Sequence, residues 1–215
     1  ISELSNIPED DIRSAARILT QNDSLSILLG NDNLDDKDAY NLNNEVINLL
    51  MLTGFDENQG GIYPLYSGAN TLGARNMGII PKEDNFSINN IAEKINNGDI
   101  KALLLFADGI PVTKGPLYES IDKLSNLEFL FVSSPFDNEF TKVANVVSAC
   151  TTYDEQTATI TNIERRIQSL NAARNPKFEQ ISTKNLILGI SENMGFSEFS
   201  KYSKVDIFDD IVKNV

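Results

Sequence analysis

Four short apolar runs, separated by segments with helical periodicity, constrain the fold of this chain more than any other feature. They are residues 25–29, A-L-L-L-F at 102–106, E-F-L-F-V at 128–132 and A-N-V-V at 144–147. Short, mainly apolar runs are typical of strands buried on both faces of a parallel sheet. Their alternation with helices predicts an α/β fold with a mostly parallel, doubly wound, Rossmann-like sheet flanked by helices.

Helix starts and stops support this alternation. Pro8 followed by three acidic residues predicts a helix that begins there, because the fixed φ and the acids suit a helix N-terminus. Gly54 stands where a left-handed helix end is expected, and Gly98 and Gly195 are expected to end helices. Further helices are predicted over 38–53, from a cap at Ser87 to 98, over 117–124, near 139, from 184 and over 205–212. The many glycines of 55–81 indicate turns or close backbone approach.

We expect residues 1–215 to form one α/β domain with three parts. Residues 1–60 form a helix–strand–helix unit, 61–150 a nucleotide-binding-like α/β unit, and 151–215 a crossing segment with C-terminal helices. The chain opens at Ile1 rather than at a methionine. We therefore expect it to be cut from a longer protein.

Charge and composition exclude several classes of function. A net charge of -13 and the pI near 4.4 disfavour nucleic-acid binding, which needs a basic face. No apolar run approaches the length of a membrane span, so we expect no membrane insertion and a cytoplasmic location. With no histidine and with Cys150 as the only cysteine, the chain holds no Ser-His-Asp or Cys-His arrangement and no disulfide, zinc or iron–sulfur site of its own.

Small and polar residues follow three of the predicted strands, at 30–32, at Ala107, Asp108 and Gly109, and at Ser133 and Ser134. Ligands of open α/β sheets bind at such strand ends. Tight turns need the same residue types, so both interpretations stay open. Neither a dinucleotide-binding glycine motif nor a P-loop is present. The carboxylates lie at helix starts and on surface faces, and they form no acid–base pair.

Several segments together resemble the molybdopterin oxidoreductase superfamily. These are A-L-L-L-F-A-D-G at 102–109, F-L-F-V at 129–132, A-N-V-V at 144–147 and T-Y-D-E-Q-T-A-T-I-T-N-I-E-R-R-I-Q at 152–168, in this order and spacing. Upstream, A-N-T-L-G-A-R-N-M-G-I-I-P at 69–81 is similar to the superfamily's segment of Asn, Gly-Ala and Met-Gly. The resemblance covers nearly the whole chain.

Two kinds of protein within the superfamily are similar to this sequence. One is the large iron–sulfur subunit of NADH-quinone oxidoreductase, which Asp108 and Ala158 favour. The other is a formate-dehydrogenase-like catalytic subunit with a bis-molybdopterin guanine dinucleotide, to which the pair Arg165 and Arg166 is closer. Ser134 stands where an acidic residue is common in the superfamily, so the carboxylate that would accept hydrogen bonds from guanine N–H groups is missing. We therefore expect the C-terminal half of a large iron–sulfur subunit of the NADH-quinone oxidoreductase type, acting as a scaffold with no chemistry of its own.

The resemblance also implies site residues and partners. The candidate cofactor-binding residues are Asn70, Gly73, Asp108, Gly109, Ser133, Ser134, Asn162, Arg165 and Arg166. No catalytic or metal-ligating residue is implied. Asn162, Glu164 and Arg166 would hold the crossing toward an iron–sulfur domain through fixed hydrogen bonds and an Arg–carboxylate fork. The parent protein would carry 4Fe-4S clusters, with molybdopterin guanine dinucleotide in the formate-dehydrogenase alternative. Its partners would be the rest of the polypeptide and other subunits, which could hold it at the inner membrane.

Overall fold

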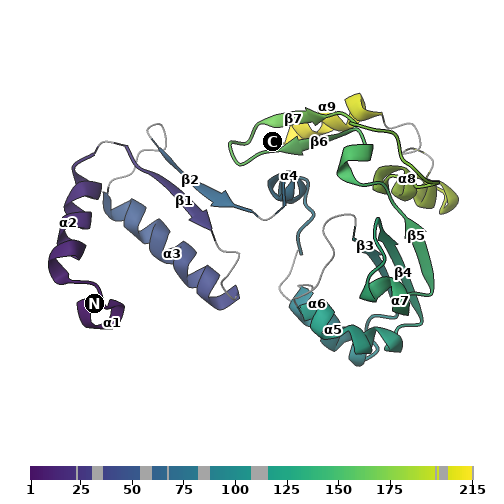
Figure 1. Cartoon of the computed structure of the whole chain (residues 1–215), viewed down its shortest axis with the longest axis horizontal. Coiled ribbons are helices and arrows are strands. Elements are labelled where there is room, and N and C mark those ends of the chain that lie inside the picture. Colours follow the sequence, from purple (N-terminus) through teal and green to yellow (C-terminus); the bar gives the residue numbers. More distant parts are fainter. Residues whose placement is uncertain are drawn as a thin grey trace. The chain divides into compact units, whose positions relative to one another are not determined.

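The computed structural model describes residues 1–22, 24–30, 36–53, 60–66, 68–81, 88–107, 116–196, 198 and 203–214. The chain divides into two compact units (Figure 1). Unit 1 comprises Ile1–Leu72 and Thr161–Arg166, and unit 2 comprises Gly73–Ile160 and Ile167–Val215. The expected division of one α/β domain into the parts 1–60, 61–150 and 151–215 remains a prediction.

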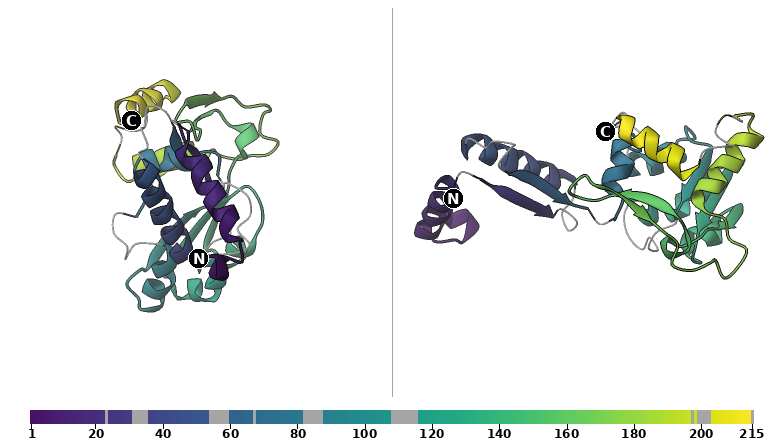
Figure 2. Two further views of the ribbon diagram at one scale, coloured as in Figure 1. Left: turned by 90° about the vertical axis from the view of Figure 1, so that its left-hand side faces the viewer. Right: turned by 90° about the horizontal axis from the view of Figure 1, so that it is seen from above.

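Unit 1 is built on a pair of parallel strands. Its elements are α1 (Ser2–Ser5), α2 (Glu9–Thr20), β1 (Ser26–Gly30), α3 (Asp36–Thr53) and β2 (Gly61–Leu65). β1 and β2 pair in parallel from Ser26 opposite Gly61 to Gly30 opposite Leu65. Helix α3 lies along this pair (Figures 1 and 2), and Leu29 of β1 and Leu50 of α3 are buried.

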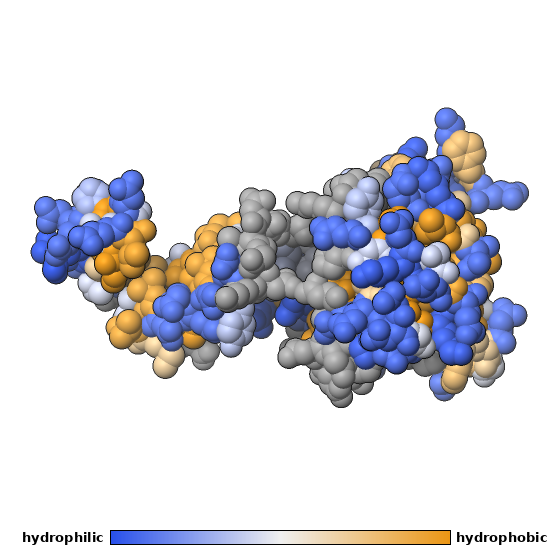
Figure 3. Space-filling view, turned by 90° about the horizontal axis from the view of Figure 1, so that it is seen from below, coloured by the Kyte–Doolittle hydropathy of each residue, from blue (hydrophilic) through white to orange (hydrophobic). Residues whose placement is uncertain are grey.

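Helix α2 contributes little to a core. It begins after Pro8, which occupies the cap position, and none of its residues is buried. Its apolar side chains border an open apolar groove of about 680 Å³ together with the C-terminal part of α3. Hydrophobic atoms are accordingly visible on the surface at this end of the chain (Figure 3).

Unit 2 contains a three-stranded parallel sheet in the order β3-β4-β5. Its strands are β3 (Ala102–Phe106), β4 (Phe129–Ser134) and β5 (Val146–Ala149). A separate two-stranded hairpin is formed by β6 (Ala158–Thr161) and β7 (Ile167–Leu170), and its last β6 residue, Thr161, and the loop that follows belong to unit 1. The helices are α4 (Thr71–Asn76), which begins at the end of unit 1, α5 (Ile88–Asn96), α6 (Pro116–Glu119), η2 (Ile121–Asn126), α7 (Glu139–Val143), η3 (Tyr153–Glu155), α8 (Thr183–Asn193) and α9 (Lys204–Asn214).

The core of unit 2 lies between the sheet and helices α5, α6, η2 and α7. Its buried members are Ile95, Leu117, Leu124, Leu127, Leu130, Val132 and Phe140. The Tyr118 and Phe140 rings meet edge to face with centroids 6.2 Å apart. Leu130 and Val132 are alternate residues of β4, so one face of this strand packs into the core.

The structure confirms a mixed α/β fold with parallel strands flanked by helices, and each of the four apolar runs overlaps a strand, although β5 (Val146–Ala149) begins two residues later than its run. Gly98 and Gly195 follow α5 and α8, as predicted, and the structure gives them left-handed φ values of 78° and 92°. Strands β2, β6 and β7 were not predicted. β2 lies in the glycine-rich stretch 55–81, and β6 and β7 mix polar and apolar residues. The proposed cap at Ser87 and helix end at Gly54 lie outside the described residues. Within the described ranges, no helix is both long and apolar enough to cross a membrane.

The first testable prediction concerns Gly60, beside the start of β1. A Cβ at this position would lie 1.9 Å from Leu25 O and 2.7 Å from Leu25 C, and Gly61 N donates to the same carbonyl at 3.1 Å. Only backbone movement relieves such a clash. We expect Gly60→Ala to lower the free energy of unfolding by about 2 kcal/mol, measured by denaturant unfolding.

Gly30→Ala is the matched control. Its Cβ would lie 4.0 Å from its nearest neighbour, Leu65 Cδ1. Equal stability of the Gly60→Ala and Gly30→Ala proteins would contradict the close approach of Gly60 to Leu25.

Candidate functional site

The carboxyl ends of β3, β4 and β5 come together at one edge of the sheet of unit 2. Backbone hydrogen bonds extend the pairing beyond the strands. Ala107 N donates to Ser133 O at 2.7 Å, and Cys150 N donates to Ser134 O at 3.3 Å. This is the edge at which ligands of open α/β sheets bind. Two of the predicted cofactor residues, Ser133 and Ser134, therefore lie here, whereas Asp108 and Gly109 fall outside the described residues.

The two serines are both buried, but their hydroxyl groups are used differently. Ser134 Oγ donates to Phe136 O at 2.7 Å and accepts from Asn138 Nδ2 at 3.0 Å. Ser133 is 0% exposed, and its Oγ has no hydrogen-bond partner among the described residues. Ser134 thus holds the turn that leads into α7. Buried polar atoms are nearly always paired. The unused hydrogen-bonding capacity of the Ser133 hydroxyl therefore fits a polar ligand group at this edge.

Asn70 makes a hydrogen bond over a large sequence separation within unit 1. Its Oδ1 accepts from the N–H of buried Thr161 at 2.9 Å, although the two residues are 91 positions apart. Asn70 therefore positions the start of the loop 162–166. Gly73 is buried in α4, where its carbonyl accepts from Met77 N at 3.1 Å. Cofactor binding by Asn70 and Gly73 remains a prediction.

The loop 162–166 joins β6 to β7. Asn162 Oδ1 accepts from Glu164 N at 3.0 Å and from Arg166 N at 2.9 Å, so Asn162 fixes the shape of the loop itself. That these residues hold a crossing toward an iron–sulfur domain remains a prediction. Arg165 adopts a left-handed conformation with φ of 62°. The predicted Arg–carboxylate fork is absent from this described loop. Arg166 Nε lies 3.4 Å from Glu164 Oε2 in a single contact, and the side chains are 76% and 56% exposed. Exposed pairs of this kind contribute little stability.

A network around η3 was not predicted from the sequence. Glu155 is buried, its Oε2 accepts from Thr152 N at 3.2 Å, and its Oε1 lies 3.1 Å from a terminal nitrogen of Arg174. Arg174 Nε also donates to Asp154 Oδ2 at 2.7 Å. The Thr-x-x-Glu spacing of Thr152 and Glu155 is a capping-box pattern and could have identified the turn. No local signal could have identified Arg174 as the partner.

This network shifts the pKa values of its members. Hydrogen bonds from Thr152 and then Arg174 lower the pKa of Asp154 below its ordinary value of 3.8, because both stabilise the charged carboxylate. Asp154, in turn, raises the pKa of Arg174. Within the described ranges, no cluster of three or more His, Cys, Asp and Glu side chains is suited to hold a metal ion.

Comparison with known proteins identifies the family of this chain. Residues 14–193 match the molybdopterin oxidoreductase family. This chain belongs to that family. As a molybdopterin oxidoreductase domain, it shares its family with proteins that bind molybdopterin, and its strand edge carries the unpaired Ser133 hydroxyl described above.

Three relatives illustrate the similarity of this molybdopterin oxidoreductase domain to whole enzymes. The F420-dependent formate dehydrogenase subunit alpha of Methanocaldococcus jannaschii is 31% identical, over 77% of this chain and 28% of the relative. The NADPH-Fe(3+) oxidoreductase subunit alpha of Geobacter sulfurreducens is 30% identical, over 80% of this chain and 23% of the relative. The assimilatory nitrate reductase catalytic subunit of Bacillus subtilis is 31% identical, over 55% of this chain and 17% of the relative.

The chain spans about a quarter of the length of the first two relatives. These relatives support the molybdopterin oxidoreductase superfamily that the sequence predicted. They do not single out the large iron–sulfur subunit of NADH-quinone oxidoreductase, which was the preferred expectation within it. Both are named as alpha subunits, which agrees with the expectation of subunit partners.

The second prediction concerns the acid stability of the η3 network. Because the pKa of Asp154 is lower in the folded state, its stabilising contribution is present above the ordinary value of 3.8 and is lost as the pH falls through the folded-state pKa. We expect Asp154→Asn to lower the melting temperature at neutral pH, and the difference from the wild type to close in strong acid. Thermal unfolding from neutral pH to about pH 2 measures this.

Asp122→Asn, at an exposed position of η2, is the control. A difference between wild type and Asp154→Asn that stays constant down to strong acid would show that Asp154 does not act through its charge.

Proposed function

We propose that this chain forms part of the alpha subunit of a formate-dehydrogenase-like molybdenum or tungsten oxidoreductase, in which unit 2 helps to hold the pterin cofactor. The observation that carries this proposal is the family match over 14–193 together with 31% identity to a formate dehydrogenase alpha subunit. The relatives point to this function more directly than to the scaffold of an NADH-quinone oxidoreductase.

The strand edge of unit 2 offers one described group for such a cofactor. The Ser133 hydroxyl is buried and unpaired, and it can donate to a phosphate or pterin oxygen or accept from an N–H group. Asp108 and Gly109, which follow β3 in the sequence, are proposed contacts as well. Asn70, Gly73, Asn162, Arg165 and Arg166 are the remaining ones, and the exposed guanidinium groups of the two arginines suit an anionic group.

A bound molybdenum or tungsten pterin centre supplies the two-electron redox chemistry in such enzymes. The part of this chain is to bind and orient that group. Cys150, the single cysteine, is buried after β5, so we assign no metal ligand to this chain. The metal ligand and the iron–sulfur clusters would then belong to other parts of the protein.

One observation favours a second candidate function, a scaffold that no longer binds the cofactor. Ser134 stands where an acid is common in the superfamily, and its hydroxyl is already bonded to Phe136 and Asn138. Ser134 therefore provides no carboxylate to a guanine edge, and its hydroxyl has little hydrogen-bonding capacity left. The two candidates differ in whether the full-length protein contains molybdenum or tungsten.

Metal content distinguishes the cofactor-binding subunit from the scaffold. The full-length protein, purified without air, is expected to contain stoichiometric molybdenum or tungsten together with iron, and to reduce a dye in the presence of formate. Elemental analysis and a dye-reduction assay measure these properties. Iron without molybdenum or tungsten would overturn the proposal and support the scaffold.

The fourth prediction tests Ser133 directly. Ser133→Ala removes a buried, unpaired hydroxyl, so we expect the cofactor-free protein to gain about 1 kcal/mol of stability. We expect the same variant to retain less pterin on purification, because the cofactor loses a contact. Denaturant unfolding and the pterin content of the purified protein give the two values.

Ser125→Ala is the matched control, since Ser125 Oγ donates to Asp122 O at 2.7 Å on the exposed side of η2. Pterin content equal to that of the wild type in Ser133→Ala would remove Ser133 from the proposed contacts.

A further inference from the structure

The sequence contains a single Asn-Gly pair, Asn97 and Gly98, directly after α5. Asparagine is thermolabile, and it reacts most readily before glycine, which has no side chain to hinder attack by its own backbone nitrogen. Both residues are exposed, so water reaches them. The nitrogen that attacks and the amide that is attacked belong to adjacent residues, and the sequence alone therefore places them within reach of each other.

Backbone hydrogen bonds close the end of α5 in a Schellman motif. Gly98 N donates to Ile95 O at 3.1 Å, and Asp99 N donates to Lys94 O at 2.9 Å. Gly98 has a φ of 78°, the left-handed conformation that this motif requires. In the closed motif the Gly98 nitrogen keeps its proton, which it must lose before it can attack. The helix end must therefore open before Asn97 reacts, and exposed helix ends open at low cost in free energy.

Helix α8 ends in the same motif without an asparagine before the glycine. Its two closing hydrogen bonds run from Gly195 N to Glu192 O at 3.0 Å and from Phe196 N to Ser191 O at 2.9 Å. The residue before Gly195 is Met194, whose thioether offers no carbonyl carbon for attack. The two helix ends thus share their backbone geometry and differ in the side chain that could react.

We propose that Asn97 is a site of spontaneous deamidation whose rate is set by opening of the end of α5. In the open state the deprotonated Gly98 nitrogen attacks the side-chain carbonyl carbon of Asn97. A C–N bond forms, ammonia leaves with a proton taken from water, and a five-membered succinimide remains. One water molecule then adds to either ring carbonyl and opens the ring, which gives aspartate or isoaspartate at position 97. Water is the only co-reactant, and the proposal does not depend on the metal content or the redox activity of the protein.

The reaction changes a helix that supplies the core of unit 2. Ala92 and Ile95 of α5 are 6% and 1% exposed. A new carboxylate at position 97 lies close to Asp99 in the sequence and at the negative end of the helix dipole, and both are unfavourable. Isoaspartate also lengthens the backbone by one methylene group, which disrupts the closing hydrogen bonds. We therefore expect the deamidated protein to melt at a lower temperature.

The test incubates the full-length protein in mildly alkaline buffer, both folded and unfolded in urea. Mass spectrometry of the tryptic peptide 95–101 then follows deamidation at Asn97 and at Asn96, which precedes an asparagine instead of a glycine. We expect Asn97 to react faster than Asn96, and about tenfold more slowly in the folded protein than in urea, because its reaction requires the open helix end. The proposal is overturned if Asn97 reacts equally fast in both states, or no faster than Asn96 in either.

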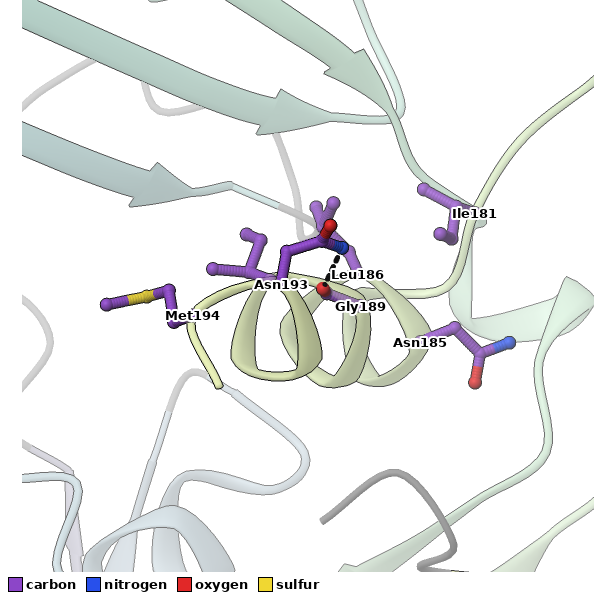
Figure 4. Close-up of a pocket in the computed structure, with 7 residues that line it drawn as sticks. Ile181, Asn185, Leu186, Gly189, Asn193 and Met194 are labelled. Atoms are coloured by element: carbon purple, nitrogen blue, oxygen red, sulfur yellow. Dashed lines mark hydrogen bonds between the residues drawn. The ribbon is translucent and has the colours of Figure 1, made fainter. Parts of the chain in front are cut away.

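Met194→Asn transfers the reactive pair to the matching end of α8. Met194 is 69% exposed, and Figure 4 shows it beside Asn193, whose Nδ2 donates to Gly189 O at 2.8 Å. We expect deamidation at position 194 in this variant and none at Asn193. An unreactive position 194 would contradict the proposed role of the Asn-Gly pair in this motif.

Asn97→Gln is the matched control, because glutamine would have to form a six-membered ring, which is much slower. We expect the melting temperature of this variant to stay constant during the incubation while that of the wild type falls. Equal losses in the two proteins would show that deamidation of Asn97 does not weaken α5.

Discussion

Strand β4 lies between β3 and β5, and five of its six residues are buried. Leu130 and Val132 project into the core beneath the helices, while Phe131 and Ser133 alternate onto the other side of the strand. The parallel register pairs Phe106 with Ser133 and Ser134 with Ala149. The ends of all three strands are therefore fixed relative to β4, and any loss of its packing would displace the whole strand edge.

A series of backbone and side-chain contacts connects this strand edge to the segments before and after it in unit 2. Cys150 pairs with Ile181 in an isolated bridge, so the segment before α8 is tied to the end of β5. Arg174 then connects this segment to the η3 turn through Asp154 and Glu155. The exposed ion pair of Arg174 with Asp154 contributes little to the stability of the fold. The buried Glu155 carboxylate, in contrast, needs its partners to offset the cost of its desolvation. The network thus acts mainly to fix the shape of the segment.

The sequence predicted the elements whose signals are local. Apolar runs identified β1, β3, β4 and β5, and glycines located the ends of α5 and α8. It could not predict contacts between distant segments. The Asn70–Thr161 hydrogen bond, the pairing of Arg174 with Glu155 and the close approach of Gly60 to Leu25 each depend on tertiary packing. Ser133 and Ser134 look alike in sequence, and only the structure separates the unpaired hydroxyl from the one that holds a turn.

Among the described residues, the buried side-chain atoms without a partner are Ser133 Oγ, Thr151 Oγ1 and Gln180 Oε1, and all three lie in unit 2. A core that served only as a scaffold could replace these atoms with apolar groups of similar shape at little cost in stability. Ser133 belongs to the end of β4, whereas Thr151 and Gln180 line a separate pocket. Since the two places share no side chain, a polar group bound at one satisfies nothing at the other. The three unpaired atoms therefore lower the stability of unit 2, and packing among the described residues does not offset this cost.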